Sequence, residues 1–150
     1  MTAVTVTAAH LLEQKGRAIF SISPEASVYD AIAEMAARRV GALLVMEGDR
    51  LEGIISERDY TRKVILHGRA SRETLVKEIM ASPVVTVPPN TSVPDCMALM
   101  TAHHIRHLPV MENGAPAGVL SIGDLVKAMV AAQAETISLL QGYIAGAYPA

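Results

Sequence analysis

Residues 53–59 read Gly-Ile-Ile-Ser-Glu-Arg-Asp, and residues 118–124 read Gly-Val-Leu-Ser-Ile-Gly-Asp. A single shift of 65 positions, from Asp59 to Asp124, superimposes the first half of the chain on the second without a gap. The shift also aligns other identical residues: Pro24 with Pro89, Ser27 with Ser92, Asp30 with Asp95, and Val45-Met46-Glu47 with Val110-Met111-Glu112. Such a duplication predicts two copies of one structural unit, packed about a pseudo-two-fold axis with related clefts between them.

Each copy has the same order of predicted elements. An apolar run with β-branched residues predicts a first strand, and a proline turn ends it because proline cannot continue a ladder. Ser27 and Ser92 then stand at helix N-caps, each with an aspartate three residues later, as in a capping box. A hairpin and a second helix complete each copy. The predicted fold class is α/β, with two pseudo-symmetric β-α-β-β-α repeats that begin with strands at 18–22 and 84–87.

The predicted organisation has five parts. The repeats take residues 16–67 and 80–133, and a polar connector at 68–79 joins them. Residues 1–15 form an N-terminal extension, and 134–150 form a helical C-terminal tail. One helical stripe near this tail contains Val130, Ile137, Leu140 and Ile144. Either a second subunit covers this stripe, or the tail folds back onto its own core, and the sequence favours neither alternative.

Of the 150 residues, 51% are hydrophobic and 19% are charged, which is typical of a folded globular protein. Apolar stretches are interrupted well before the roughly 20 residues that a membrane helix needs. The first residues lack the basic and apolar segments of a secretory signal. The single cysteine, Cys96, excludes an internal disulfide and predicts a small buried helix position. We therefore expect a cytoplasmic protein.

Charge and residue content also narrow the function. A net charge of −2 argues against nucleic acid as a partner, because phosphate backbones are bound by basic surfaces. Aromatic residues make up only 3% and tryptophan is absent, which removes the usual stacking platforms for bases. The sequence contains no nucleophile–histidine–acid order, no strong motif of paired carboxylates and no glycine-rich phosphate loop. These observations predict a binding module rather than an enzyme.

The two Ser-x-x-Asp motifs lie where a strand ends and a helix begins. That junction exposes backbone N–H groups at the positive end of a helix dipole, which favours a phosphate. The carboxylate of Asp59 or Asp124 can accept hydrogen bonds from both hydroxyls of a ribose. The alternative is helix capping alone, with the serine at the N-cap and the aspartate at N3. The presence of the motif in both copies favours a ligand.

These motifs in combination resemble a tandem pair of CBS (cystathionine β-synthase) domains over residues 16–133. The resemblance rests on the capped helices, on the Ser-x-x-Asp motifs, and on the segments 41–45 and 106–111, Gly-Ala-Leu-Leu-Val and Arg-His-Leu-Pro-Val-Met. It implies an adenosyl ligand (AMP, ADP, ATP, S-adenosylmethionine or NAD(H)) in clefts between the repeats. It also implies a disc-shaped homodimer that regulates an unidentified protein, with no metal expected.

The resemblance assigns roles to individual residues. Ribose would be held by Asp59 and Asp124, with Ser56 and Ser121 beside them. The first-strand hydroxyl position is taken by Ser21 and Thr86. One adenine slot would be lined by Val84, Ile105 and Pro109, and the other by Ile19, Val40 and Ala42.

The halves differ in ways that predict two unequal sites. The second repeat carries Arg106, His107 and Pro109 where the first has Gly41, Ala42 and Leu44. The first repeat has Arg58 and Lys63 after its serine where the second has Gly123 and Ala128, and we expect Arg58 to contact phosphate. Arg62 lies four residues from Arg58, so the alternative is that both line one exposed face and form salt bridges.

Two other classes of function stay open. His103, His104 and His107 suggest a metal-dependent enzyme, for example a hydrolase. No neighbouring carboxylate or thiolate completes a tetrahedral ligand set in the sequence, so a phosphate contact from His104, or from Arg39 at the equivalent position, is favoured over a metal. The default interpretation of these side chains is solvated charge at a helix end. The last alternative is a purely structural dimerisation adaptor whose clefts stay empty.

Overall fold

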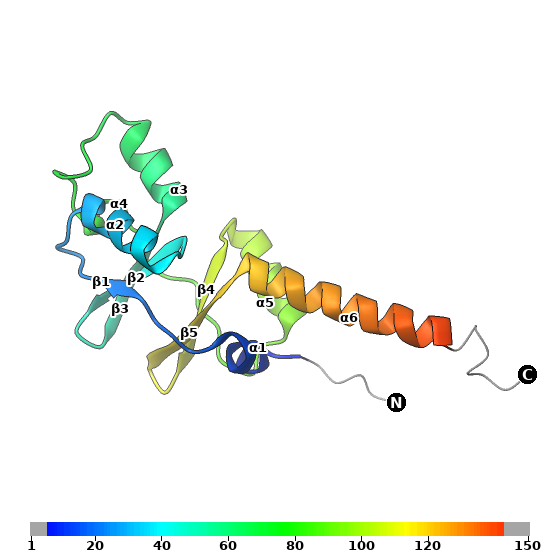
Figure 1. The fold of residues 1–150 in the computed structure, drawn as a ribbon. Coiled ribbons are helices and arrows are strands. Elements are labelled where there is room, and N and C mark those ends of the chain that lie inside the picture. The colour runs from blue at the N-terminus through cyan, green and yellow to red at the C-terminus, as the bar shows by residue number, and fades with distance from the viewer. Residues whose placement is uncertain (1–5, 143–150) are drawn as a thin grey trace, which may run out of the picture.

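The computed structural model describes residues 6–142. Figure 1 shows the chain, whose elements are α1 (Ala8–Lys15), β1 (Ser21–Ile22), α2 (Val28–Arg38), β2 (Ala42–Glu47), β3 (Arg50–Ser56), α3 (Glu57–Tyr60), the π-helix η1 (Thr61–Ile65), α4 (Val76–Ile79), α5 (Val93–His103), β4 (His107–Glu112), β5 (Ala115–Ser121) and α6 (Ile122–Gly142). No helix in the described part is long and apolar enough to cross a membrane.

The two predicted repeats are present, each built on an antiparallel hairpin. β2 pairs with β3, and β4 pairs with β5 in the equivalent register, with the same irregularity after Val45 and after Val110. Ser27 and Ser92 cap α2 and α5, because each hydroxyl accepts a bond from the backbone N–H three residues on, at 3.1 and 3.2 Å. The α/β repeat architecture is therefore confirmed.

The first strands are shorter than predicted. β1 contains only two residues and runs parallel to β2. The strand predicted at 84–87 is wrong, because only an isolated parallel bridge joins Val87 to Val110. In the first repeat, the Leu44 N–H donates to the Phe20 carbonyl at 3.1 Å. Its counterpart in the second repeat is Pro109, which has no N–H, so the equivalent rung cannot form.

The short helix that precedes each repeat packs in the core of the other repeat. α1 precedes the first repeat but packs in the core of the second, whereas α4 precedes the second and packs in the core of the first. Glycines permit both approaches: a Cβ on Gly118 would lie 2.6 Å from Leu12 Cδ2, and one on Gly53 would lie 2.5 Å from Met80 Sδ. The predicted N-terminal extension and connector therefore each supply a helix to the opposite repeat.

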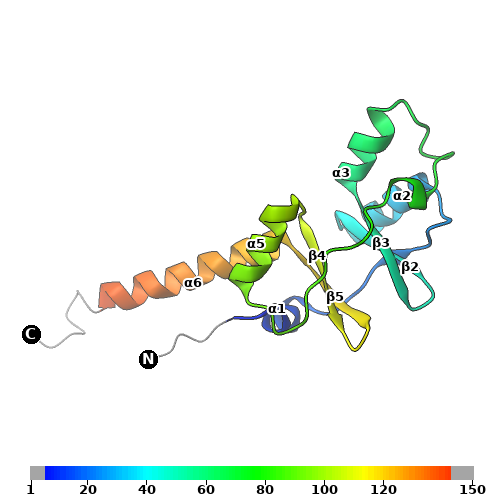
Figure 2. The same cartoon turned by 180° about the vertical axis from the view of Figure 1, so that it is seen from behind.

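The C-terminal helix leaves the globular part. α6 is continuous from Ile122, so the predicted tail is the extension of the second repeat's last helix. Figures 1 and 2 show it projecting away from the two repeats. Val130, Ile137 and Leu140 are more than half exposed, so the alternative in which this stripe folds back onto its own core is wrong for the described residues. Ile144 lies outside them.

Candidate functional site

Two clefts lie between the repeats, and each combines the Ser-x-x-Asp motif of one repeat with the apolar segments of the other. The Asp59 cleft, of about 330 Å³, contains Ser56 and Asp59 together with Val84, Ile105 and His107. The Asp124 cleft, of about 410 Å³, contains Ser121 and Asp124 together with Ala18, Phe20, Val40 and Ala42. Both volumes fall in the range of small-molecule sites.

Each Ser-x-x-Asp motif caps its helix in the same way. The Ser56 hydroxyl accepts from the Asp59 N–H at 3.3 Å, while Asp59 Oδ2 accepts from the Ser56 N–H and hydroxyl at 2.9 and 3.1 Å. Ser121 and Asp124 repeat these bonds at 3.3, 2.7 and 3.0 Å. The side chains of the two aspartates are still 17% and 21% exposed, so capping leaves both carboxylates reachable from their clefts.

A lysine contacts each of these carboxylates, and the two lysines come from unrelated positions. Lys63 lies one turn after Asp59; its Nζ is 3.2 Å from Asp59 Oδ1 and donates to the Ile79 carbonyl at 2.8 Å. Lys15 lies at the end of α1, and its Nζ donates to Asp124 Oδ2 and to the Val119 carbonyl, both at 2.7 Å. Burial opposes ionisation of Asp124, but the bonds from Lys15 and from the Ser121 N–H outweigh it, so the pKa of Asp124 is lowered.

The Asp59 cleft is rich in arginine. Arg58, Arg62 and Lys63 enter from α3 and η1, and Arg106 enters from the second repeat. The pKa of Arg58 is lowered, because the Arg62 charge disfavours another cation, with smaller effects from burial and from Arg106. Among the described residues, neither Arg58 nor Arg62 forms an ion pair, so the salt-bridge alternative for this face is wrong. A cluster of unneutralised guanidinium groups favours an anion.

His107 lies between the two clefts and lines both of them. Its ring faces Gly41, where a Cβ would lie 3.5 Å from both Cε1 and Nε2. Burial lowers the pKa of His107, and the charges of Lys15 and Arg106 lower it further against the opposing effect of Asp124. His107 is therefore a largely neutral ring in the wall that separates the sites.

Most of the predicted residues meet at the clefts, and four do not. Val40, Ala42, Ser121 and Asp124 line one cleft; Ser56, Arg58, Asp59, Lys63, Val84, Ile105 and Arg106 line the other; and His107 lines both. Ile19, Ser21, Thr86 and Pro109 do not line either cleft in the described structure, so their proposed ligand contacts stay predictions.

Local structure explains why these four side chains lie outside the clefts. In extended chain, successive side chains point to opposite sides, so Ala18 and Phe20 face the Asp124 cleft while Ile19 and Ser21 do not. Thr86 lies on a different surface, and Pro109 is buried within β4. The two-residue alternation could have placed Phe20, but no sequence signal points to Lys15, because the repeat shift aligns it with Met80.

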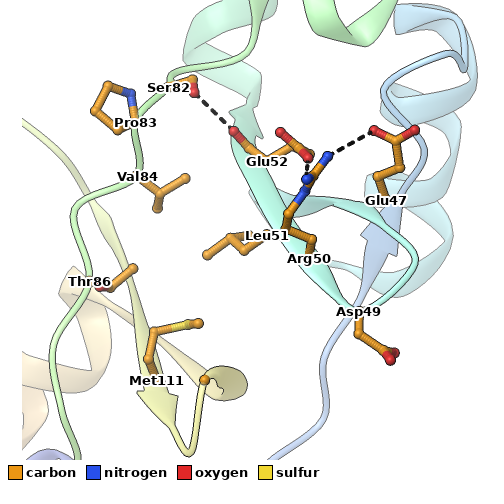
Figure 3. A pocket seen from close by; sticks show the side chains of 11 residues that line it. Glu47, Asp49, Arg50, Leu51, Glu52, Ser82, Pro83, Val84, Thr86 and Met111 are labelled. Atoms are coloured by element: carbon orange, nitrogen blue, oxygen red, sulfur yellow. Dashed lines mark hydrogen bonds and ion pairs between the residues drawn. The ribbon is translucent and has the colours of Figure 1, made fainter.

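Thr86 lines a third hollow, an open groove of about 850 Å³ between the tips of the two hairpins. Figure 3 shows Arg50 in this groove, bonded to the acidic side chains of Glu47 and Glu52. The Ser82 hydroxyl donates to the Glu52 carbonyl at 2.9 Å on the same side. The polar groups of this groove thus largely satisfy one another, in contrast to the arginines of the Asp59 cleft.

The histidines suggested as metal ligands do not converge. His103 and His104 are exposed at the end of α5; His104 lines the Asp59 cleft with His107, whereas His103 does not. Within residues 6–142, no group of three or more His, Cys, Asp or Glu side chains is placed to hold a metal ion. The geometry of the described part gives the metal-dependent enzyme no support.

Comparisons with known proteins agree with this architecture. The family model of the CBS domain matches residues 16–65 and 76–131. The mitochondrial CBS domain-containing protein CBSX3 of Arabidopsis thaliana is 45% identical over 127 residues, which cover 81% of this chain but only 62% of that protein. A CBS-domain protein from Burkholderia ambifaria has a solved structure with 49% identity and a TM-score of 0.81, covering 84% of this chain and 95% of that one. Another, from Agrobacterium tumefaciens, has 36% identity and a TM-score of 0.79, covering 83% and 99%.

Proposed function

The chain belongs to the CBS family as a tandem pair of CBS domains, and we propose that it is a regulatory module that binds adenosine nucleotides in the Asp59 and Asp124 clefts. CBS domains commonly bind adenosyl ligands, and stand-alone CBS-pair proteins are generally regulatory rather than catalytic. AMP, ADP, ATP and NAD(H) are the proposed ligands, with S-adenosylmethionine as a further member of the same class.

One observation carries the proposal. In both clefts a partly exposed aspartate at a helix start lines the same cavity as apolar side chains from the opposite repeat, and Gly41 and His107 line both cavities. A nucleoside needs these two kinds of surface, because its base is apolar on both faces while its ribose presents two hydroxyls. Arginines beside Asp59 and lysine beside Asp124 supply positive charge for phosphate.

The experiment is a thermal melt with each adenosyl ligand at millimolar concentration, followed by calorimetric titration. A ligand at about a hundred times its dissociation constant adds about 2.7 kcal/mol to the free energy of unfolding. We expect AMP or another adenosine nucleotide to raise the melting temperature of the native chain, and the double variant Asp59→Asn/Asp124→Asn to abolish the rise.

The chain offers a matched control for this experiment. Asp30 and Asp95 also follow a capping serine by three residues, but they line neither cleft. The double variant Asp30→Asn/Asp95→Asn should therefore respond to ligand like the native protein. Equal melts with and without every ligand would instead support the structural adaptor with empty clefts.

The assembly that we propose is a cytoplasmic homodimer acting on an unidentified protein. CBS proteins oligomerise, and α6 exposes Val126, Val130 and Ile137 along one stripe of helical spacing. A second copy of the chain would cover this stripe. Light scattering on Val130→Asp tests it, with the exposed Leu139→Asp as control, because Leu139 lies on another side of the helix. We expect only the first variant to lower the mass.

A further inference from the structure

Lys15 reaches a ligand site that belongs, by sequence, to the other repeat. It is the last residue of α1, and α1 is fixed on the second repeat by Leu12 against Gly118. The Ala8 and Ala9 N–H groups also donate to the carbonyls of Thr91 and Pro89, at 2.8 and 2.9 Å. The Lys15 ammonium is therefore carried into the Asp124 cleft by a docked helix rather than by a free chain end.

The contacts of Lys15 leave one oxygen of the Asp124 carboxylate available. Its Nζ donates to Oδ2 of Asp124, the same oxygen that accepts from the Ser121 N–H and hydroxyl. Within the described chain, Oδ1 of Asp124 has no hydrogen-bond partner. A ribose hydroxyl can donate to Oδ1 while the ammonium stays in place, so the lysine and a ribose do not compete for one atom.

The equivalent carboxylate in the first repeat is arranged differently. Oδ2 of Asp59 accepts from Ser56, and Oδ1 lies 3.2 Å from Lys63 Nζ, so both oxygens already have partners. The Asp59 cleft also has three arginines, whereas the other cations of the Asp124 cleft are limited to Arg39 beside Lys15, apart from the neutral His107. Neutralisation of Asp124 therefore depends mainly on a single residue.

We propose that Lys15 determines the specificity of the Asp124 cleft, by neutralising Asp124 so that the cleft accepts phosphorylated adenosine ligands rather than adenosine alone. This rests on the proposed function of the cleft. A carboxylate without a counter-charge repels a phosphate group bound a few ångströms away, and a partly buried cleft screens this repulsion less than bulk water does. The neutral nucleoside does not experience that repulsion, so the lysine discriminates between the two ligands.

The test is calorimetric titration of AMP and adenosine into an Asp59→Asn background, which leaves the Asp124 cleft as the responding site. Lys15→Met removes the ammonium and retains most of the aliphatic stem. We expect it to weaken AMP about tenfold and to change adenosine by less than about threefold, while Lys15→Arg keeps the preference for AMP. Arg17→Met removes the same charge from a side chain outside the clefts, paired with Glu112, and should change neither ligand.

Each other result has a defined meaning. Equal losses for AMP and adenosine, or a gain for both, would overturn the inference and make Lys15 a packing residue or a competitor for Asp124. If neither the native chain nor the Asp59→Asn variant binds AMP or adenosine, the result would overturn the proposed function itself. NMR titration of the Asp124 carboxyl tests the ion pair without ligand: its pKa should rise in Lys15→Met, and an unchanged pKa would contradict the pairing.

Discussion

Removal of the Asp124 carboxylate distinguishes a role in ligand binding from a role in helix capping. Loss of a ligand contact lowers the affinity, whereas loss of a cap lowers the free energy of unfolding, and the two expected magnitudes differ. In Asp124→Ala, a bound ribose loses hydrogen bonds to a charged acceptor, each worth roughly 1.5–3 kcal/mol. One such bond corresponds to an affinity loss of about ten- to a hundredfold. The expected result is this loss at the Asp124 cleft.

The effect on the fold should be smaller. The substitution removes the bonds from the Ser121 N–H and hydroxyl and the ion pair with Lys15. Loss of a cap costs about 1 kcal/mol. The ion pair is 40% exposed on the lysine side and 21% on the aspartate side, so solvent screening limits it to less than about 1 kcal/mol. A loss of about 1–2 kcal/mol lowers the melting temperature by about 2–8 °C for a chain of this size.

Calorimetric titration beside urea melts measures both quantities on one preparation. Ser92→Ala is the matched control, since the Ser92 hydroxyl caps α5 through the Asp95 N–H at 3.2 Å but lines neither cleft. We expect a similar loss of stability from this control, with affinity unchanged. If Asp124→Ala also destabilises without loss of affinity, the carboxylate is a cap and nothing more.

Two further predictions concern the cationic cleft and the wall between the sites. Arg58→Ala should weaken the binding of ATP and ADP much more than that of adenosine, and should reduce the salt dependence of ATP and ADP binding. Titration at two ionic strengths measures both effects. Equal losses of affinity for the three ligands would place Arg58 outside the site. The pKa of His107 in the folded state is depressed below 6.5. Between that pKa and 6.5 the unfolded chain therefore binds more protons than the folded chain does. The free energy of unfolding should accordingly fall as the pH drops below about 6.5. Urea melts from pH 5 to 8 should show this slope in the native chain and a flatter one in His107→Gln; equal slopes would remove His107 as its source.

The repeat made most of the architecture predictable. Gly53, Ser56 and Asp59 recur at a fixed offset, and the hairpins and caps that they imply form in both halves. The predicted strand that does not form lies where equivalent positions carry different chemistry. Pro109 stands at the position of Leu44 and cannot supply the backbone N–H that would complete a first strand, although the residues at 84–87 favour one by composition.

Contacts between segments distant in sequence were the part that no pattern indicated. The Lys15–Asp124 pair joins residues 109 positions apart, and its counterpart Lys63 pairs one turn along its own helix. Local spacing predicts the second kind of pair, whereas the first depends on α1 docking across to the opposite repeat. The aspartates and serines of the candidate site were therefore predictable, because the motif specifies them. Lys15, which reaches the site from a helix that precedes the other repeat, was not.

The exchange of α1 and α4 bears on how such a module can transmit a signal. Because each repeat buries a helix that precedes the other one, neither core is complete within its own repeat. Each cleft likewise takes its aspartate from one repeat and its apolar wall from the other. A ligand that contacts both walls stabilises the arrangement of the two repeats as well as its own site. Asp124 lies in the first turn of α6, so a ligand bound in the Asp124 cleft would contact the start of the helix whose apolar stripe extends beyond the repeats.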